Sequence, residues 1–497
     1  MRANVMSREM IRLLLVVLAL TSVGAGPASR FRKPEALLLV DGGARLLTAN
    51  RASGTVSIID VAGRRVVAEV EVGKGLADLK ELPGGRHLLA VDQKAGELVL
   101  LERRGDSIRR LSATPVAADP ARVVVGADGL HAVVVSRWSR TLTFVEWDRP
   151  DSPDAAPAVR VASTLAMPFC PLDAAVAPGD SPALLVVADA FGGRLALIDL
   201  DKRAVASVWN LPGHNLRSLK FSPDGKTLGF LGQIVNPVTR TSFDDIHWGL
   251  LMRGELHAFR VDELRTPGVD VETLLEDGRS RTIGNVGHGS ADPSSFAFGP
   301  DGAIVVALAG VDEVASSIGF GEPYERLAVG RRPSALALSA DGRTAYTADS
   351  LDDTISIVDL ADGKTAAPIV LGPRPAPTLI EEGERLFTSA LLGREGWMSC
   401  HTCHTDGHTA GVAVDTMSDG SYGAAKQTPS LLGVARTGPW TWLGRVDRLE
   451  DQVRKSITTT MRGADPTDRQ VAALTAYLRV LRSEEHTSEL QSHSDLV

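Results

Sequence analysis

The feature that most constrains the fold of this chain is an internal repeat of about 40 residues. Its turn glycines mark the period, because Gly302 and Gly342 lie 40 residues apart and Gly85 and Gly129 lie 44 apart. Each copy opens with an apolar stretch, a glycine-bearing turn and a second apolar stretch. These openings read LLLVDGGARLLTAN from Leu37, LKELPGGRHLLAVD from Leu79, VVVGADGLHAVVVS from Val123, LKFSPDGKTLGFLG from Leu219, FAFGPDGAIVVALA from Phe296 and LALSADGRTAYTAD from Leu336.

The repeat predicts a β-propeller. A looser copy begins at Cys170, which brings the number of copies to seven, and matching second halves begin at Val56, Leu195 and Ile355. Short apolar strands with glycine turns form four-stranded antiparallel sheets, and a sheet of about 40 residues buries its faces only by stacking on its neighbours. We therefore predict a mainly β chain with a seven-bladed propeller over residues 35–372. An open array of β-sandwiches is the alternative, because ring closure is not visible in the sequence.

One interval is longer than the others. Gly225 and Gly302 lie 77 residues apart, and we interpret residues 233–249 and 266–287 as loop insertions. The repeats resemble those of the YVTN family, as in VADAFGGRLALIDL from Val187 and SPDGKT from Ser222. That resemblance implies seven blades and little about chemistry, since propellers carry many unrelated functions.

Polar residues of the repeat region have structural interpretations. Three aspartates recur at one point of their copies and are expected to make turn or inter-strand hydrogen bonds: Asp60, Asp199 and Asp359. Four residues lie in or beside the insertions and are expected in solvated loops, with a pocket on one face as the alternative: Asp244, Asp245, His247 and His288. Cys170 is expected to be a buried small apolar residue.

The character of the sequence changes after Gly372. A proline-rich stretch, PRPAPT at 373–378, predicts a stiff linker, and helical patterning follows it. Residues 400–404 then read Cys-His-Thr-Cys-His, the attachment signature of c-type haem. Two thiols on one helical turn can each form a thioether to a haem vinyl group, and the histidine that follows can bind the iron.

Two other interpretations of this motif stay open. A thioredoxin-like dithiol requires a βαβ context, which the flanking sequence lacks. A zinc site requires further ligands, for which His401, His404 and His408 are available. Haem is favoured because the chain begins like an exported protein, and c-type haem is attached outside the cytoplasm.

The segment around the motif resembles the bacterial di-haem cytochrome c peroxidase family, including its MauG-like branch. The matching stretches are GERLFTSALLGREGWMSCHTCHTDG at 383–407, TPSLLGVARTGPWTWLGRVDRLEDQV at 428–453 and VAALTAYLRVL at 471–481. The resemblance implies a small all-α cytochrome c domain over residues 379–481, equivalent to the first haem domain of the family. It also implies that Cys400 and Cys403 hold the haem covalently and that His404 is the proximal iron ligand.

Further site residues follow from the same resemblance. Trp442 matches the tryptophan that the family places between its two haems as an electron relay, although Leu443 replaces the usual aspartate after it. Arg445 is expected to bind a haem propionate, with a surface ion pair as the alternative. Met461 is the best-placed distal ligand, since a thioether opposite histidine suits electron transfer. Met417 and His408 are alternative ligands, and Met461 as a simple core residue is the remaining interpretation.

The two ends of the chain are set apart from the fold. Residues 1–25 combine arginines, a short apolar run and small residues, which predicts a secretory signal and a periplasmic or otherwise exported protein with no spanning helix after cleavage. Residues 482–493 read RSEEHTSELQSH, which resembles a translated sequencing adapter, so residues 482–497 are interpreted as an artefact. We expect the natural gene to continue beyond Leu481 with a second haem domain.

These observations predict an exported electron-transfer protein with one haem c in this chain. It would belong to a propeller-fused, di-haem peroxidase-like oxidoreductase that acts on peroxide or on a redox protein partner, without identifiable catalytic residues here. The alternative is a non-enzymatic propeller that binds a protein or cell-envelope ligand and carries a mono-haem electron-carrier domain. A propeller dehydrogenase with its own organic cofactor is a third possibility. The net charge of −8 argues against a nucleic-acid partner.

Overall fold

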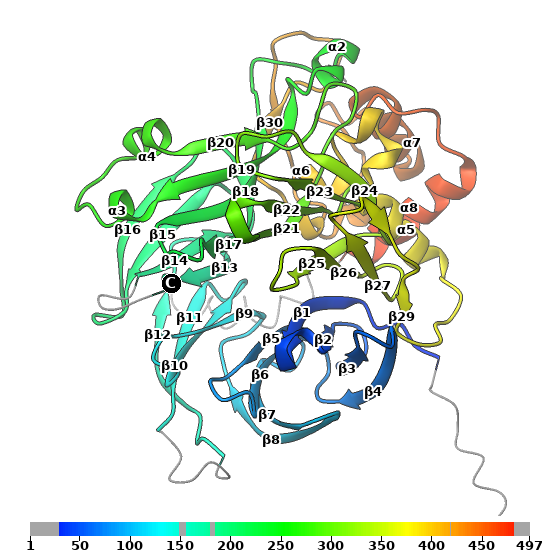
Figure 1. Cartoon of the computed structure of the whole chain (residues 1–497). Helices are drawn as coiled ribbons and strands as arrows, with labels where there is room; N and C mark the ends of the chain where they lie inside the picture. Colours follow the sequence, from blue (N-terminus) through cyan, green and yellow to red (C-terminus); the bar gives the residue numbers. More distant parts are fainter. Residues whose placement is uncertain (1–28, 149–155, 179–183, 418, 482–497) are drawn as a thin grey trace, which may run out of the picture.

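Seven antiparallel sheets, six of four strands and the last of five, follow one another along the chain and surround a common centre (Figure 1). The computed structural model describes residues 29–148, 156–178, 184–417 and 419–481, so the predicted signal sequence and the adapter-like tail lie outside the described residues. Each sheet is one propeller blade, with its first strand innermost. The prediction of a mainly β, seven-bladed propeller is therefore confirmed.

The first four blades have the following strands. They are β1 Pro34–Val40, β2 Arg45–Asn50, β3 Thr55–Asp60 and β4 Arg65–Glu71; β5 Leu76–Glu81, β6 His87–Asp92, β7 Glu97–Arg104 and β8 Ser107–Pro115; β9 Pro120–Val125, β10 His131–Ser136, β11 Thr141–Glu146 and β12 Arg160–Ala166; β13 Pro171–Val176, β14 Leu184–Asp189, β15 Arg194–Asp199 and β16 Ala204–Asn210.

The last three blades complete the ring. They are β17 His214–Phe221, β18 Thr227–Val235, β19 Met252–Arg260 and β20 Arg279–Thr282; β21 Pro293–Phe298, β22 Ile304–Leu308, β23 Glu313–Ser317 and β24 Glu325–Ala328; β25 Pro333–Leu338, β26 Thr344–Asp349, β27 Thr354–Asp359 and the short outer strands β28 Lys364–Thr365 and β29 Ile369–Val370, which both pair with β27.

The strand sequences explain the stacking of the blades. Middle strands such as β14 are buried along their whole length, because each sheet packs against a neighbour on both faces. The outer strand β4 is exposed at both ends and half-buried between them. The turn glycine Gly342 takes a positive φ of 71°, and a Cβ there would lie 2.4 Å from Cδ of Pro300 in the preceding blade. The predicted turn glycines thus fix both the hairpin and the spacing between blades.

The ring closes directly between the last and the first blade. The Ser334 hydroxyl, on β25, donates to the Pro34 carbonyl at the start of β1, at 2.8 Å. The backbone N–H groups of Arg32 and Lys33 donate to Asp353 Oδ1 at 3.1 and 2.7 Å. Each blade consists of consecutive strands, so closure needs no exchanged strand. The alternative of an open sandwich array is wrong.

The fifth blade carries the insertions. Helix α2 (Phe243–His247) lies between β18 and β19, while α3 (Val261–Leu264) and α4 (Val271–Asp277) lie between β19 and β20. The prediction of a loop at 266–287 is wrong in part, because this segment also supplies α4 and the outer strand β20. The sequence pattern does not reveal β20, because the inserted helices α3 and α4 separate it from β19.

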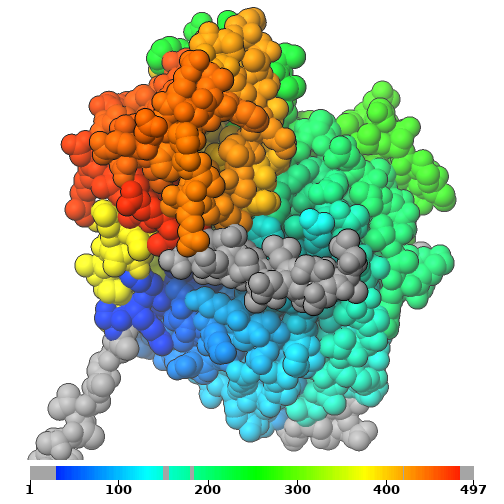
Figure 2. Space-filling model, turned by 180° about the vertical axis from the view of Figure 1, so that it is seen from behind, coloured from blue at the N-terminus to red at the C-terminus, as the bar shows by residue number. Residues whose placement is uncertain are grey.

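The C-terminal region packs helices around its own core. It contains α5 (Leu379–Thr388), α6 (Cys400–Cys403), α7 (Leu449–Lys455) and α8 (Asp468–Val480), joined by single turns and by a small ribbon of β30 (Ala413–Val414) and β31 (Lys426–Gln427). The all-α expectation did not include this ribbon. Figure 2 shows these elements, yellow to red, packed over part of the propeller. In the part of the chain that the structure describes, no helix is long and apolar enough to cross a membrane.

A glycine allows the close packing of α5 on α8, and we expect Gly383→Ala to destabilise the C-terminal region. A Cβ at Gly383 would lie 2.0 Å from the Ala473 carbonyl oxygen and 2.7 Å from Tyr477 Cβ, so the two helices must move apart. Overpacking of this kind costs about 1–3 kcal/mol. Limited proteolysis of the full chain should show faster cleavage of α5 and α8.

The control for this prediction is Gly321→Ala. A Cβ at Gly321 meets nothing within 4 Å, so this change should leave the cleavage pattern as it is in the wild type. Equal resistance of Gly383→Ala and wild type would show that the two helices tolerate separation.

Candidate haem-attachment site

The Cys-His-Thr-Cys-His motif forms a single helical turn. Helix α6 places Cys400 and Cys403 on one turn, and His404 caps its C-terminal end. The turn starts at Ser399, whose hydroxyl accepts from the Thr402 N–H while the Thr402 hydroxyl accepts from the Ser399 N–H. Both cysteines are free and half-buried. The local fold therefore presents two thiols and an imidazole from one short segment.

The three side chains are in their neutral forms. Burial, with a smaller contribution from the negative charge of Asp292, raises the pKa of the Cys400 and Cys403 thiols to about 12. Burial also lowers the pKa of His404 to about 4. A neutral imidazole is the form that binds a metal ion.

A hydrogen bond selects the tautomer of His404. Its Nδ1 lies 2.9 Å from the Pro429 carbonyl oxygen, which can only accept, so Nδ1 carries the proton and Nε2 keeps its lone pair. Metal-ligating histidines are oriented in this way. The residues present therefore fit an attached haem, with two thiols for thioether formation and Nε2 of His404 for the iron.

Met461 lies in the core that surrounds the motif. It is 4% exposed, follows the π-helical turn η7 (Ser456–Thr460), and belongs to the same cluster of apolar side chains as Cys400 and Cys403. Met417 is half-buried and lies outside this cluster. The structure thus brings one of the two candidate methionines to the cysteines.

His408 is directed to the propeller. Its Nδ1 lies 3.0 Å from Ser430 Oγ, and its ring packs edge-on against Trp138 and Phe191 at centroid distances of 5.2 and 4.9 Å. Both aromatic residues belong to propeller blades. These contacts hold His408 at the boundary between the two parts of the chain.

Trp442 and Arg445 lie on an exposed loop between Trp440 and Val446. Trp442 is 64% exposed, Leu443 beside it is 53% exposed, and Arg445 is exposed as well. None of the three belongs to the core cluster around the cysteines. The roles of Trp442 and Arg445 remain predictions.

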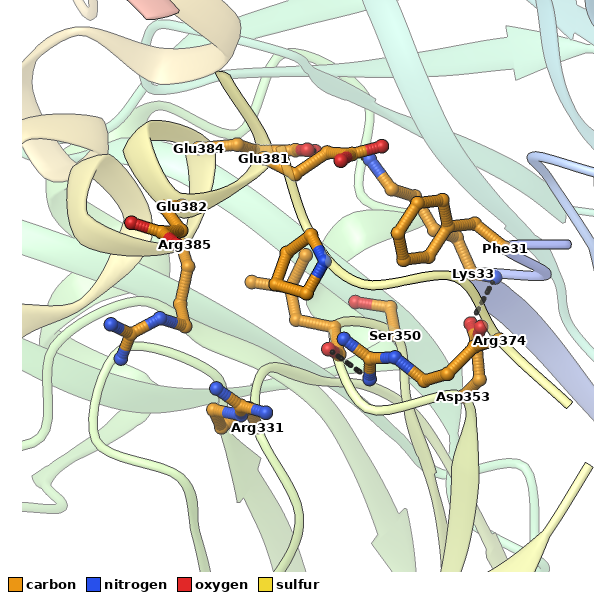
Figure 3. Close-up of a pocket in the computed structure, with 12 residues that line it drawn as sticks. Phe31, Lys33, Arg331, Ser350, Asp353, Arg374, Glu381, Glu382, Glu384 and Arg385 are labelled. Carbon is orange, nitrogen blue, oxygen red and sulfur yellow. Dashed lines mark hydrogen bonds and ion pairs between the residues drawn. The ribbon is translucent and has the colours of Figure 1, made fainter. Parts of the chain in front are cut away.

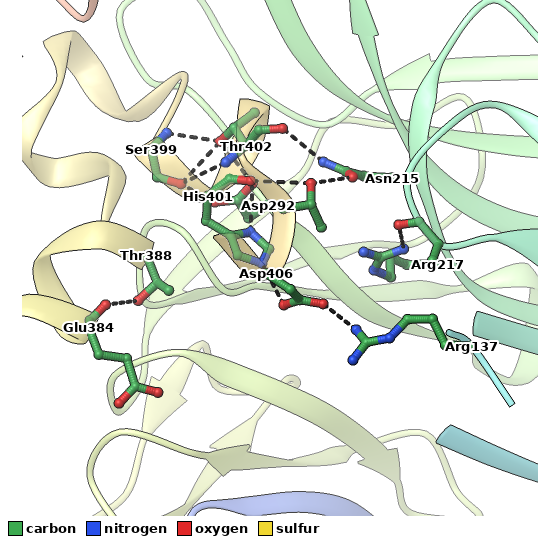
Figure 4. Close-up of polar contacts among 12 residues, drawn as sticks. Arg137, Asn215, Arg217, Asp292, Glu384, Thr388, Ser399, His401, Thr402 and Asp406 are labelled. Atoms are coloured by element: carbon green, nitrogen blue, oxygen red, sulfur yellow. Dashed lines mark hydrogen bonds and ion pairs between the residues drawn. The ribbon is translucent and has the colours of Figure 1, made fainter. Parts of the chain in front are cut away.

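The sequence did not reveal that the propeller holds the motif. The buried carboxylate of Asp292, directly before β21, accepts from Ser399 Oγ at 2.5 Å and from Thr402 Oγ1 at 2.8 Å (Figure 4). Asn215 Nδ2 donates to the Thr402 carbonyl at 2.9 Å, and Thr405 Oγ1 donates to Asn215 Oδ1 at 2.6 Å. Propeller side chains therefore contact both ends of the helical turn.

Charged side chains extend this network. Arg137 binds Asp119 at 2.9 Å and Asp406 at 2.5 Å, and Asp406 Oδ1 lies 3.3 Å from His401 Nε2. Burial alone would lower the pKa of His401, but its interactions with Asp292 and Asp406 outweigh that effect and raise it. His401 and Thr402, the two residues between the cysteines, thus both contact side chains of the propeller or of its charged network.

The insertion of the fifth blade forms a second contact. Trp397 is 3% exposed, and its ring packs closely against Gly249 and Gly284 of the insertion. A Cβ at Gly249 would lie 2.4 Å from the ring, and a Cβ at Gly284 would lie 2.9 Å from it. His247 Nδ1 lies 3.0 Å from Glu395 Oε2, and Ile246 of α2 joins the C-terminal core. His247 lies in α2 and not in a loop, and its side chain stays 40% exposed while it pairs with the C-terminal region.

Four other residues singled out in the repeats behave as expected, whereas Asp244 and Asp245 lie in α2 and not in a loop. Asp199 Oδ1 accepts from the Lys202 N–H at 2.9 Å, and Asp359 Oδ1 accepts from the Ala361 N–H at 3.0 Å. Asp60 pairs across strands with Arg45 at 3.2 Å. Cys170 is buried, and burial raises the pKa of its thiol.

Two cavities lie between the propeller and α5. The first, about 40 Å³, is lined by Lys33, Asp353, Arg374 and Glu381 among others (Figure 3). The second, about 200 Å³, is lined by residues such as Arg331, Arg385 and Gln470. Neither is lined by the residues of the Cys-His-Thr-Cys-His motif. Across the described ranges, no group of three or more His, Cys, Asp or Glu side chains is placed to hold a metal ion.

The fold and the site define a β-propeller protein fused to a domain of the cytochrome c class. Residues 377–491 match the model of a family described as di-haem cytochrome c peroxidase, and the C-terminal part of the chain is a domain of this family. The resemblance predicted from the motifs is therefore confirmed.

Two curated relatives are similar to part of this chain. The methylamine utilization protein MauG of Methylophilus methylotrophus is 33% identical over 96 residues, which are 18% of this chain and 27% of that protein. The protein of the same name from Methylorubrum extorquens is 35% identical over 88 residues, which are 16% of this chain and 24% of that protein. The chain thus spans about a quarter of the length of these relatives.

A solved structure matches the propeller. A chain of Kuenenia stuttgartiensis hydrazine synthase is similar with a TM-score of 0.54 and 15% identity, over 68% of this chain and 98% of that chain. This similarity shows the fold alone.

Proposed function

We propose that the protein is an exported haem c protein that transfers electrons as part of a propeller-fused, MauG-like di-haem oxidoreductase. The observation that carries this proposal is the His404 geometry, in which Nδ1 donates to the Pro429 carbonyl and Nε2 stays available beside two thiols on one turn. Bound haem supplies one-electron chemistry. Cys400 and Cys403 would anchor it, His404 would bind the iron, and Met461 would be the distal ligand.

The domain organisation is part of the proposal. Residues 1–25 would direct export to the periplasm, 35–372 form the propeller, 373–378 the linker and 379–481 the haem domain. The family model supports the haem domain, and its match extends to residue 491. A second haem domain in the natural gene would place Trp442 between the two haems, which accords with its exposure. Arg445, on the same exposed loop, would bind a propionate.

The proposal is tested on the protein encoded by the natural gene, produced with c-type haem maturation in a periplasm. We expect covalently bound haem by haem staining and sustained hydrogen peroxide consumption with a reduced cytochrome as electron donor. Peroxide is the expected acceptor because the family model is that of a peroxidase. Absence of covalent haem would overturn the proposal, whereas haem without peroxide turnover would leave only the electron-transfer part.

The second candidate function is a non-enzymatic propeller that binds a protein or cell-envelope ligand and carries a mono-haem electron carrier. The buried Met461 beside the cysteines favours it, because a His/Met-coordinated iron suits electron transfer rather than peroxide binding. Haem that is fully six-coordinate in both redox states and does not react with peroxide would favour this function.

A further inference from the structure

The haem-attachment turn rests on one face of the propeller, and this face is built from equivalent positions of the blades. In several blades the innermost strand starts with a proline. The residue directly before this proline either contacts the C-terminal region or binds another propeller residue that contacts it. Lys33 Nζ pairs with Glu384 of α5 at 2.5 Å. Asp119 holds Arg137, which binds Asp406. Asp292 occupies the same position before β21.

Asp292 differs from the other positions because it contacts the motif itself. It is 7% exposed, and each of its oxygens accepts a hydroxyl hydrogen bond, from Ser399 at 2.5 Å and from Thr402 at 2.8 Å (Figure 4). Its Oδ1 also lies 3.8 Å from His401 Nδ1. Buried hydrogen bonds to a charged acceptor are the strong ones, and they define geometry as well as energy.

The two hydroxyls that Asp292 binds also close the reciprocal cap of the turn. Ser399 Oγ accepts from the Thr402 N–H and Thr402 Oγ1 accepts from the Ser399 N–H, so Asp292 fixes the orientation of both. The isolated turn has only four residues, and so short a helix is not stable without tertiary contacts. The conformation of this turn therefore depends on the propeller.

We propose that Asp292 is a positioning residue, through which the propeller holds the segment from Ser399 to His404 in the conformation that carries the haem and places a negative charge beside that segment. This inference rests on the proposed function. The Asp292 carboxylate would act through Ser399 and Thr402 on the positions of the two cysteines and His404. The negative charge of Asp292 would favour the oxidised, more positive state of the haem. The propeller would then set the reduction potential as well as support the domain.

The experiment compares Asp292→Ala and Asp292→Asn with the wild type. Hydrogen exchange of the amides between Ser399 and Gly407 should be at least about tenfold faster in Asp292→Ala, since two buried hydrogen bonds lose their acceptor. Asp292→Asn keeps the shape of the side chain and one oxygen acceptor. The amide exchange of residues 399–407 in this variant should therefore be faster than in the wild type and slower than in Asp292→Ala. The midpoint potential of the haem should become more positive in both variants.

A matched control separates this effect from general destabilisation. Asp92, fully buried in the second blade, accepts from the Lys74 and Gly75 N–H groups at 2.7 and 3.0 Å. Asp92→Ala should leave both the exchange of residues 399–407 and the midpoint potential unchanged. Equal effects of Asp92→Ala and Asp292→Ala, or no effect of Asp292→Ala on exchange, would overturn the inference.

The two proposals fail in different ways. A wild-type protein without covalent haem would overturn the proposed function, while the exchange comparison would still decide whether Asp292 holds the turn. Faster exchange in Asp292→Ala with an unchanged midpoint potential would overturn the electrostatic part of the inference.

Discussion

Replacement of both cysteines by serine, Cys400→Ser with Cys403→Ser, is expected to abolish covalent haem attachment. Each thiol can form one thioether, and both lie on the single turn α6 beside His404. Serine keeps the size of the side chain but cannot form the thioether. Haem staining of the denatured protein, which retains only covalently attached haem, should therefore fall to the background level.

The single variants and Cys170 provide the controls. We expect Cys400→Ser and Cys403→Ser to retain at most one thioether, which shifts the α-band of the reduced pyridine haemochrome. Cys170 is buried in the propeller and should be replaceable by serine without loss of stain. Persistent staining of the double variant would show that the haem is attached elsewhere.

Met461→Ala is expected to remove the sixth ligand of the haem iron. Met461 is buried beside the cysteines and follows a π-helical turn, an irregularity that is frequent at functional sites. The weak methionine-to-iron charge-transfer band of the oxidised protein should disappear. The midpoint potential should also fall, because a thioether ligand raises it.

Met417 tests the specificity of this assignment. Met417 is the alternative methionine ligand considered from the sequence, and it lies outside the apolar cluster of the cysteines. Met417→Ala should preserve the charge-transfer band. A band that persists in Met461→Ala and disappears in Met417→Ala would reverse the assignment, and a band that persists in both would show that neither of these two methionines is the ligand.

Local sequence patterns and motif spacing predict much of the fold and of the haem-attachment site of this protein. Alternating apolar strands and turn glycines such as Gly129 and Gly342 predict the blades because each strand and turn is encoded within a few residues. The Cys-His-Thr-Cys-His motif likewise predicts its chemistry, since five adjacent residues supply both thiols and the imidazole. The orientation of His404 was not readable, because its hydrogen-bond partner Pro429 lies 25 positions away.

The fifth blade shows where local patterns fail. Its insertion interrupts the spacing, so β20 lies within a segment predicted as a loop, and the sequence does not predict the contact of His247 with Glu395. Nothing in the composition of this segment shows that Gly249 and Gly284 leave space for Trp397, because that contact joins segments more than 100 residues apart.

The sequence by itself determined the seven repeats, the attachment motif and the family of the C-terminal domain, because all three depend on residues that are close in the chain. Closure of the repeats into a ring was decided by the tertiary structure. Only the tertiary structure decided that the motif is held by the propeller through Asp292, Asn215 and Arg137. Those side chains belong to three different blades, and ring closure brings them to one face. Long-range contacts of this kind leave no periodic signal, since each depends on the path of the whole chain between its partners.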